Sequence, residues 1–215
     1  DQWEGQRVVR DPQGAVVMMQ GSLAAYLAVG RGKVLTLLQR LAYQAHAGQP
    51  DLVGTADLAE DVLVLALMGV SDRADLQPRL LVDYLSQRAG LLTPRGVKVY
   101  TFPHRTFQEY LAACHLTEEE FPERVAHLAR TAPGRWREAT LLAAAKVVRG
   151  TPFALWSLVD ELCPHLLQGD TIAEADAWGA LLAGQAIDET MRDPAGHLPT
   201  LSVRNRERVD RVRHS

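Results

Sequence analysis

The sequence predicts a mainly α protein: a winged-helix domain with a short β-hairpin wing, followed by an α-helical, HEAT-like repeat region. Two observations support this fold class. Between residues 33 and 116, three helical patterns, a hairpin pattern and a further helix follow one another, which is the element order of a winged helix. From residue 117 onward, apolar residues recur only at helical spacing. We therefore divide the chain into the end of a preceding helical segment or linker (1–32), a winged-helix domain (33–116) and a helical-repeat region that is incomplete at its C-terminus (117–215).

Composition is that of an ordinary globular protein. Hydrophobic residues make up 47% and charged residues 23% of the 215 residues, and the formal net charge is −3. This balance gives no overall bias toward nucleic acid, and no apolar run reaches the 18 residues of a membrane span. The two cysteines form no CxxC pair, so we expect buried thiols in a reducing cytoplasm. The start, DQWEGQRVVRD, lacks the apolar centre of a signal peptide and reads like the middle of a longer protein.

Three helices are predicted before the hairpin. The N-terminal linker is punctuated by five glycines, and only its SLAAYLAV stretch is predicted to be helical. Apolar residues recur at helical spacing over residues 33–47, which predicts the first helix. A second helix opens at Asp57, which has capping-box spacing to Glu60, and a third runs from about Asp72 to Arg88. The predicted apolar face of the third helix comprises Leu76, Leu80, Leu81, Tyr84 and Leu85.

The stretch LLTPRGVKVYTF predicts the wing. Two β-prone runs, Leu91–Thr93 and Val97–Phe102, flank a Pro-Arg-Gly turn. The next helix starts just after His104, because Thr106 and Glu109 have capping-box spacing. Its predicted buried stripe comprises Phe107, Tyr110, Leu111 and Cys114.

The C-terminal half predicts helices only. Thr117 and Glu120 form another capping box. Tryptophans recur about every 21 residues, so a helix pair would repeat in the HEAT-like range of about 40–47 residues, with a compact bundle as the alternative. The arginine-rich tail RNRERVDRVRHS is predicted to be a helix with a charged solvent face. Predicted apolar positions in this half include Trp136, Phe153, Trp156, Cys163 and Trp178.

The sequence carries no motif of a self-contained enzyme. Gly32-Lys33 resembles part of a P-loop, but Val34 stands where a Ser or Thr is needed, and Leu27 where the first glycine is needed. The Cys-His neighbours at 114–115 and 163–165 lack the spacing of a zinc site. We therefore expect no catalytic residue and no metal site.

Two other classes of function stay open. A winged helix that binds DNA normally has a basic recognition helix, but the third helix carries three acidic and three basic residues, and the wing adds only Arg95 and Lys98. We therefore expect no nucleic-acid partner. A helical-repeat adaptor for protein partners is the other alternative.

The stretch FPHRTFQEYLAACHL resembles the F-x-H-x-[ST]-F-Q-E-[YF]-L-A-A signature of NACHT-type NTPases, which are STAND-class signalling switches related to the NOD-like receptors. Further stretches, LLQRLAYQAHA, LLVDYLSQRAGLL, GRWREATLLAAA and DQWEGQR, are similar to the segments around that signature. The resemblance covers most of residues 1–165. The matching positions are Phe102, His104, Thr106, Phe107, Gln108, Glu109, Tyr110, Leu111, Ala112 and Ala113.

The resemblance implies a regulatory role without catalysis in this chain. The Walker A and B segments of the family lie upstream and are absent from this sequence, so the parent protein would be the ATPase. In the family, the winged-helix histidine contacts the β-phosphate of ADP and holds the inactive state; here that residue is His104. Arg105 is a second phosphate donor or a solvated arginine, and the alternative for His104 is a structural role at the helix start.

Partners and cofactors follow from the same resemblance. ADP or ATP would bind the full-length parent, and neither is expected to bind this chain tightly on its own. The partners implied are the upstream P-loop NTPase domain of the same protein, a protein ligand on the helical repeats and an oligomer on activation. By analogy, the parent acts in signalling or defence in the cytoplasm.

Overall fold

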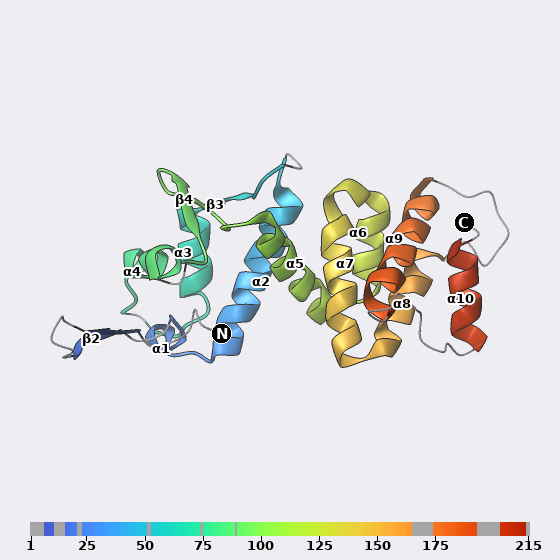
Figure 1. The fold of residues 1–215 in the computed structure, drawn as a ribbon. Helices are drawn as coiled ribbons and strands as arrows, with labels where there is room; N and C mark the ends of the chain where they lie inside the picture. The colour runs from blue at the N-terminus through green and yellow to red at the C-terminus, as the bar shows by residue number, and fades with distance from the viewer. Residues whose placement is uncertain are drawn as a thin grey trace. The chain divides into compact units, whose positions relative to one another are not determined.

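The computed structural model describes residues 7–10, 16–20, 23–50, 53–73, 75–88, 90–164, 174–192 and 203–213. The chain is mainly helical and divides into two compact units, Asp1–Gln108 and Glu109–Ser215 (Figure 1). Within the described ranges, no helix is both long and apolar enough to cross a membrane. The domain limits at residues 32 and 116 remain a prediction.

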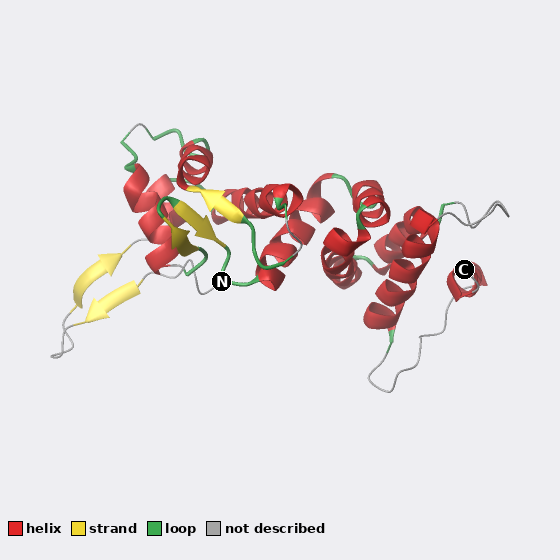
Figure 2. Cartoon of the chain, turned by 90° about the horizontal axis from the view of Figure 1, so that it is seen from above, coloured by secondary structure: helices red, strands yellow, loops and turns green. Residues whose placement is uncertain are grey.

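The first unit holds all the described strands and the helices of the predicted winged helix (Figure 2). Strands β1 and β2 form an antiparallel hairpin, and a second antiparallel sheet has the strand order β3-β5-β4. The elements are β1 (Arg7–Arg10), β2 (Val16–Gln20), α1 (Leu23–Leu27), α2 (Arg31–Gly48), β3 (Asp57–Ala59), α3 (Glu60–Met68), α4 (Pro78–Asp83), the π-helical turn η2 (Tyr84–Arg88), β4 (Thr93–Gly96), β5 (Val99–Thr101) and the start of α5 (Arg105–Glu119).

The N-terminal part contains a hairpin that the sequence prediction does not include. The prediction for 1–32 is a helical segment or linker, whereas β1 pairs with β2 there, and among the described residues before α2 only α1 is helical. Consecutive valines in both strands favour the extended backbone. The predicted SLAAYLAV helix is confirmed as α1, and the predicted helix over 33–47 is confirmed as α2, whose inner side buries Val34 and Leu41.

The predicted cap at Asp57 is wrong. Asp57 begins strand β3 and pairs with Thr101 of β5, so residues 57–59 are extended. Helix α3 starts at Glu60, whose backbone N–H donates to the Lys98 carbonyl at 2.9 Å. Pairing with a distant strand therefore overrides the local capping pattern.

The third helix starts later than predicted. The described residues before it, 72–73 and 75–77, are not helical. Arg73 links this stretch to α1, because it donates to the Tyr26 carbonyl at 2.8 Å and lies over the Tyr26 ring. The helix begins at Pro78, a residue favoured in the first turn because its missing N–H is not needed there. Its predicted apolar face is confirmed at Leu81, Tyr84 and Leu85 but is wrong at Leu80, which is 48% exposed; Leu76 is buried but precedes the helix.

The predicted wing is confirmed, with a shifted turn. Pro94-Arg95-Gly96 lies within edge strand β4, where a proline costs no ladder hydrogen bond, and the chain reverses at Val97-Lys98 instead. Lys98 has a positive φ of 57°, as a tight hairpin turn requires.

Helix α5 also departs from its predicted cap. It begins at Arg105, so Thr106 is already helical, and Glu109 is buried rather than at an exposed capping position. The predicted stripe is confirmed at Leu111 and Cys114, but Tyr110 is 46% exposed.

Every element described in the second unit is a helix. After α5 come α6 (Glu123–Thr131), α7 (Pro133–Gly150), α8 (Pro152–Leu162), α9 (Glu174–Met191) and α10 (Val203–Arg213). Helices α6, α7, α8 and α9 each contact the other three. Both a four-helix bundle and two stacked helical hairpins have this arrangement, so the HEAT-like repeat remains a prediction.

Three sequence predictions for this unit are corrected. The capping box at Thr117 is wrong, because α5 continues to Glu119 and the Thr117 hydroxyl donates back to the Cys114 carbonyl at 2.8 Å. Trp136, Trp156 and Cys163 are buried as predicted, whereas Phe153 is 65% and Trp178 39% exposed. On α9, Leu182 and Ala186, which share the predicted apolar face with Trp178, are buried, and Ala180, Ala183 and Ile187 are buried as well.

Candidate functional site

His104 occupies the turn between the last wing strand and α5. It follows β5, which ends at Thr101, and precedes the first helical residue, Arg105. Its carbonyl accepts the backbone N–H groups of Phe107 at 3.1 Å and Gln108 at 3.2 Å. The His104 side chain is exposed, and the structure gives its imidazole no hydrogen bond or ion pair to any described residue. An imidazole N–H donor is therefore available at a helix N-terminus, where backbone dipoles favour an anion.

Two aromatic residues, Phe102 and Phe107, pack on each other at the turn that carries His104. Phe102 is 1% exposed and packs edge-to-face on Phe107, with ring centroids 6.1 Å apart and planes at 67°. Arg105, the other predicted site residue, is half-buried as the first residue of α5. The structure thus brings both predicted site residues to one helix start.

Gln108 is a buried polar residue that the sequence prediction leaves without a role. Its side chain has 0% exposure. The Oε1 atom accepts the backbone N–H of Ala56 at 2.9 Å. The Nε2 atom lies 3.1 Å from Nδ1 of His46 and 3.4 Å from Oε1 of Gln49, both at the C-terminal end of α2. The sequence signal for this residue is its place in the FQEY stretch, but its partners are 52 to 62 residues away along the chain.

This geometry assigns the roles of donor and acceptor around Gln108. Because Oε1 accepts from Ala56, the amide NH₂ faces His46, whose Nδ1 must then accept. His46 is 2% exposed, and it is therefore a core histidine that satisfies the Gln108 amide.

Ala56 is also bound from the other side. The Thr101 hydroxyl donates to the Ala56 carbonyl at 3.0 Å. The Thr55 hydroxyl lies 2.5 Å from the Thr101 hydroxyl. Because Thr101 has a single hydroxyl proton and donates it to Ala56, Thr55 is the donor in the hydrogen bond between the two hydroxyls. Residues before and after His104 therefore both bind the backbone of Ala56.

The sequence of this domain matches the model of a known family. The family model described as "Winged helix-turn-helix domain C-terminal to NACHT" matches residues 1–116 of the chain. The chain belongs to this family. No curated protein and no solved structure matches it.

Membership confirms the main sequence interpretation. The NACHT-associated winged-helix domain is a regulatory module and not a catalytic one, and the mainly helical fold with a winged-helix domain is as expected. The roles of His104 and Arg105 toward a nucleotide remain predictions.

The wing of this NACHT-associated domain carries a cation that is already paired. Arg95 Nη1 lies 2.9 Å from Asp57 Oδ1 and donates to the Thr55 carbonyl at 3.1 Å. The pair borders a pocket of about 330 Å³ that also includes Gln49 and Ala56. Arg95 is one of the two wing cations on which DNA binding would depend, so this pairing weighs against that alternative.

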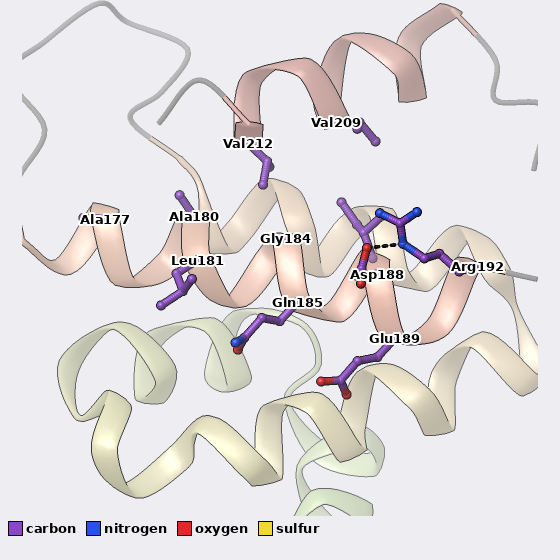
Figure 3. Close-up of a pocket in the computed structure, with 11 residues that line it drawn as sticks. Ala177, Ala180, Leu181, Gly184, Gln185, Asp188, Glu189, Arg192, Val209 and Val212 are labelled. Carbon is purple, nitrogen blue, oxygen red and sulfur yellow. Dashed lines mark hydrogen bonds and ion pairs between the residues drawn. The ribbon is translucent and has the colours of Figure 1, made fainter. Parts of the chain in front are cut away.

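A larger pocket lies within the second unit. It has a volume of about 690 Å³ between α9 and α10, with Val209 and Val212 of α10 over α9 (Figure 3). Asp188 and Arg192 form an ion pair at one end of it (Figure 3). Over the part of the chain that the structure describes, no three His, Cys, Asp or Glu side chains gather to hold a metal ion.

Proposed function

We propose that this chain is the regulatory part of a NACHT-type signal-transduction NTPase and that His104 contacts the β-phosphate of ADP in the autoinhibited parent. The observation that carries the proposal is the exposed His104 imidazole at the start of α5 in a NACHT-associated winged-helix domain. Its carbonyl is bound by the first turn of the helix, whereas its ring is available to a ligand.

The chemistry of the turn suits a phosphate. A histidine N–H donates to a phosphate oxygen, and a protonated ring adds charge to that hydrogen bond. The N-terminus of the 15-residue helix α5 contributes a further positive potential. Arg105, one residue on, is proposed as a second and weaker phosphate donor.

A contact of this kind makes the domain arrangement depend on the nucleotide. ADP that binds His104 only in the closed state stabilises that state, and exchange of the nucleotide removes the differential interaction. The P-loop domain that supplies the Walker segments is proposed to lie upstream, as the family description places this domain C-terminal to NACHT. We propose that activation leads to an oligomer and that the helices after residue 116 take a protein ligand.

The cellular setting is part of the same proposal. Cys114 and Cys163 are both buried free cysteines, which supports the proposed reducing cytoplasm. Signalling or defence is the role proposed for the parent, by analogy with the family.

The test is the nucleotide content of the protein with its NACHT domain. We expect the wild type to retain ADP through purification and His104→Ala to lose it, with ADP release faster by on the order of tenfold or more, the worth of a charge-assisted hydrogen bond. His127→Ala, at an exposed histidine of α6, is the matched control and should retain ADP. If His104→Ala retains ADP like the wild type, His104 is a structural residue and the chain acts as a scaffold or adaptor.

A further inference from the structure

Both ends of the segment that carries His104 are attached to one residue. Before His104, the Thr101 hydroxyl donates to the Ala56 carbonyl at 3.0 Å. After it, the Gln108 side chain accepts the Ala56 N–H at 2.9 Å. We refer to Thr101, Ala56 and Gln108 together as the Ala56 clamp.

The clamp leaves the His104 segment little freedom at its ends. Ala56 is itself 4% exposed and leads into β3, which pairs with β5. Phe102 and Phe107 pack on each other between the clamped ends. The His104 carbonyl is bound to the N–H of Gln108, so the backbone of His104 moves with the clamped residue.

Gln108 uses its whole side-chain amide in these contacts. Its oxygen binds Ala56, and its two N–H groups face His46 and Gln49. Gln49 in turn donates to the carbonyls of Val53 at 3.1 Å and Gly54 at 3.3 Å, in the segment that leads to Ala56. The position of the His104 backbone is therefore fixed by the end of α2 and by residues 53–56 together.

We infer that Thr101 and Gln108 are positioning residues for His104: by clamping both ends of its turn to Ala56, they hold the imidazole where a nucleotide phosphate is sensed. The inference rests on the proposed function of His104. It follows from the general requirement that a group binding a ligand be held within about 0.5 Å by packed and hydrogen-bonded supporting residues.

The test uses substitutions that keep side-chain size but remove the clamp. Thr101→Val and Gln108→Met each remove the hydrogen bonds to Ala56, whereas Thr101→Ser keeps the hydroxyl. In the protein with its NACHT domain, loaded with fluorescent ADP, we expect Thr101→Val and Gln108→Met to speed ADP release several-fold, toward the His104→Ala rate. Thr101→Ser should release ADP at a rate close to that of the wild type.

Two comparisons separate positioning from loss of stability. Leu67→Val, at a fully buried residue of α3, should lower the melting temperature without changing ADP release. In a His104→Ala background, Thr101→Val and Gln108→Met should add no further acceleration, because the group that they position is gone.

Each contrary result has a distinct meaning. If His104→Ala speeds release but the clamp variants do not, the positioning role is wrong and the sensor stands. If the clamp variants speed release equally with and without His104, they act by another route, and the inference is overturned. If His104→Ala has no effect, the proposed function itself fails and the positioning role fails with it.

Discussion

Nε2 of Gln108 lies 3.1 Å from Nδ1 of His46, and both side chains are buried. A buried donor and acceptor that satisfy each other contribute modestly as a pair, but either is costly when left alone. We expect Gln108→Met and His46→Leu each to lower the free energy of unfolding by about 1–3 kcal/mol. The double variant should lower it by less than the sum, with a coupling of about 1 kcal/mol, measured by urea unfolding of all four proteins.

A pair of residues that share no hydrogen bond supplies the control for this cycle. Combining Gln108→Met with Leu81→Ala, at a buried position of α4, should give additive losses within about 0.5 kcal/mol. Additive losses for His46 and Gln108 as well would contradict the hydrogen bond.

The contact between Gln108 and His46 shows which part of this site the sequence can predict and which part it cannot. The capping-like stretch and the hairpin before it place His104 between a strand and a helix, because both signals are local. The partners of Gln108 are not local: Ala56 and His46 lie 52 and 62 residues away. No spacing rule relates those positions, so the family signature points to Gln108 without saying what it binds.

The corrected elements have the same physical origin. Asp57 has the local pattern of a helix cap, yet its pairing with Thr101 across the sheet makes it a strand residue. Trp178 is apolar like a core residue, yet it is 39% exposed, whereas Gly179, Leu182 and Ala183 lie on the buried face of α9. Hydrophobicity predicts that a helix has a buried face, but the neighbouring helices decide which face it is.

Gly179 of α9 lies directly against the backbone of Leu162, the last residue of α8. A β-carbon there would collide with the carbonyl oxygen of Leu162, a backbone atom that cannot rotate away. We expect Gly179→Ala to destabilise the second unit by about 1–3 kcal/mol, despite the higher helix propensity of alanine. Thermal unfolding followed by circular dichroism measures this. Gly150→Ala, at the end of α7 with open space around it, is the matched control and should be neutral or slightly stabilising.

Arg208 attaches α10 to α8. Its side chain is 4% exposed, and its guanidinium binds both carboxylate oxygens of Asp160, with Nε 2.8 Å from Oδ1. The guanidinium also lies 5.9 Å from the centre of the Trp156 ring. Since Asp160→Asn leaves a buried cation without its partner charge, we expect faster amide exchange and proteolysis throughout α10.

The expected cost of Asp160→Asn is about 1–3 kcal/mol, below that of a fully buried pair because Asp160 is 37% exposed. Asp188→Asn breaks the exposed pair with Arg192 and should cost less than about 1 kcal/mol. Equal losses of free energy of unfolding in the two variants would show that the pair of Arg208 and Asp160 does not hold α10 in place.

Tyr100 gives the first unit a dependence on alkaline pH. Burial, followed by the charge of Glu60, raises the pKa of Tyr100, whose hydroxyl donates to Glu60 Oε2 at 3.3 Å. The folded state therefore keeps this proton at pH values where the unfolded chain loses it. The stability that Tyr100 contributes is fully present below a pH of about 10, the ordinary tyrosine pKa, and is lost as pH rises toward its folded pKa.

Ultraviolet titration of tyrosinate formation measures this, since Tyr100 should ionise later than an ordinary tyrosine. Tyr100→Phe should remove one late-ionising group and flatten the loss of stability above pH 10. Tyr110, whose pKa is raised mainly by the neighbouring Cys114, should still ionise late in that variant. Loss of a component that ionises at the ordinary tyrosine pKa, in place of a late one, would contradict the raised pKa of Tyr100.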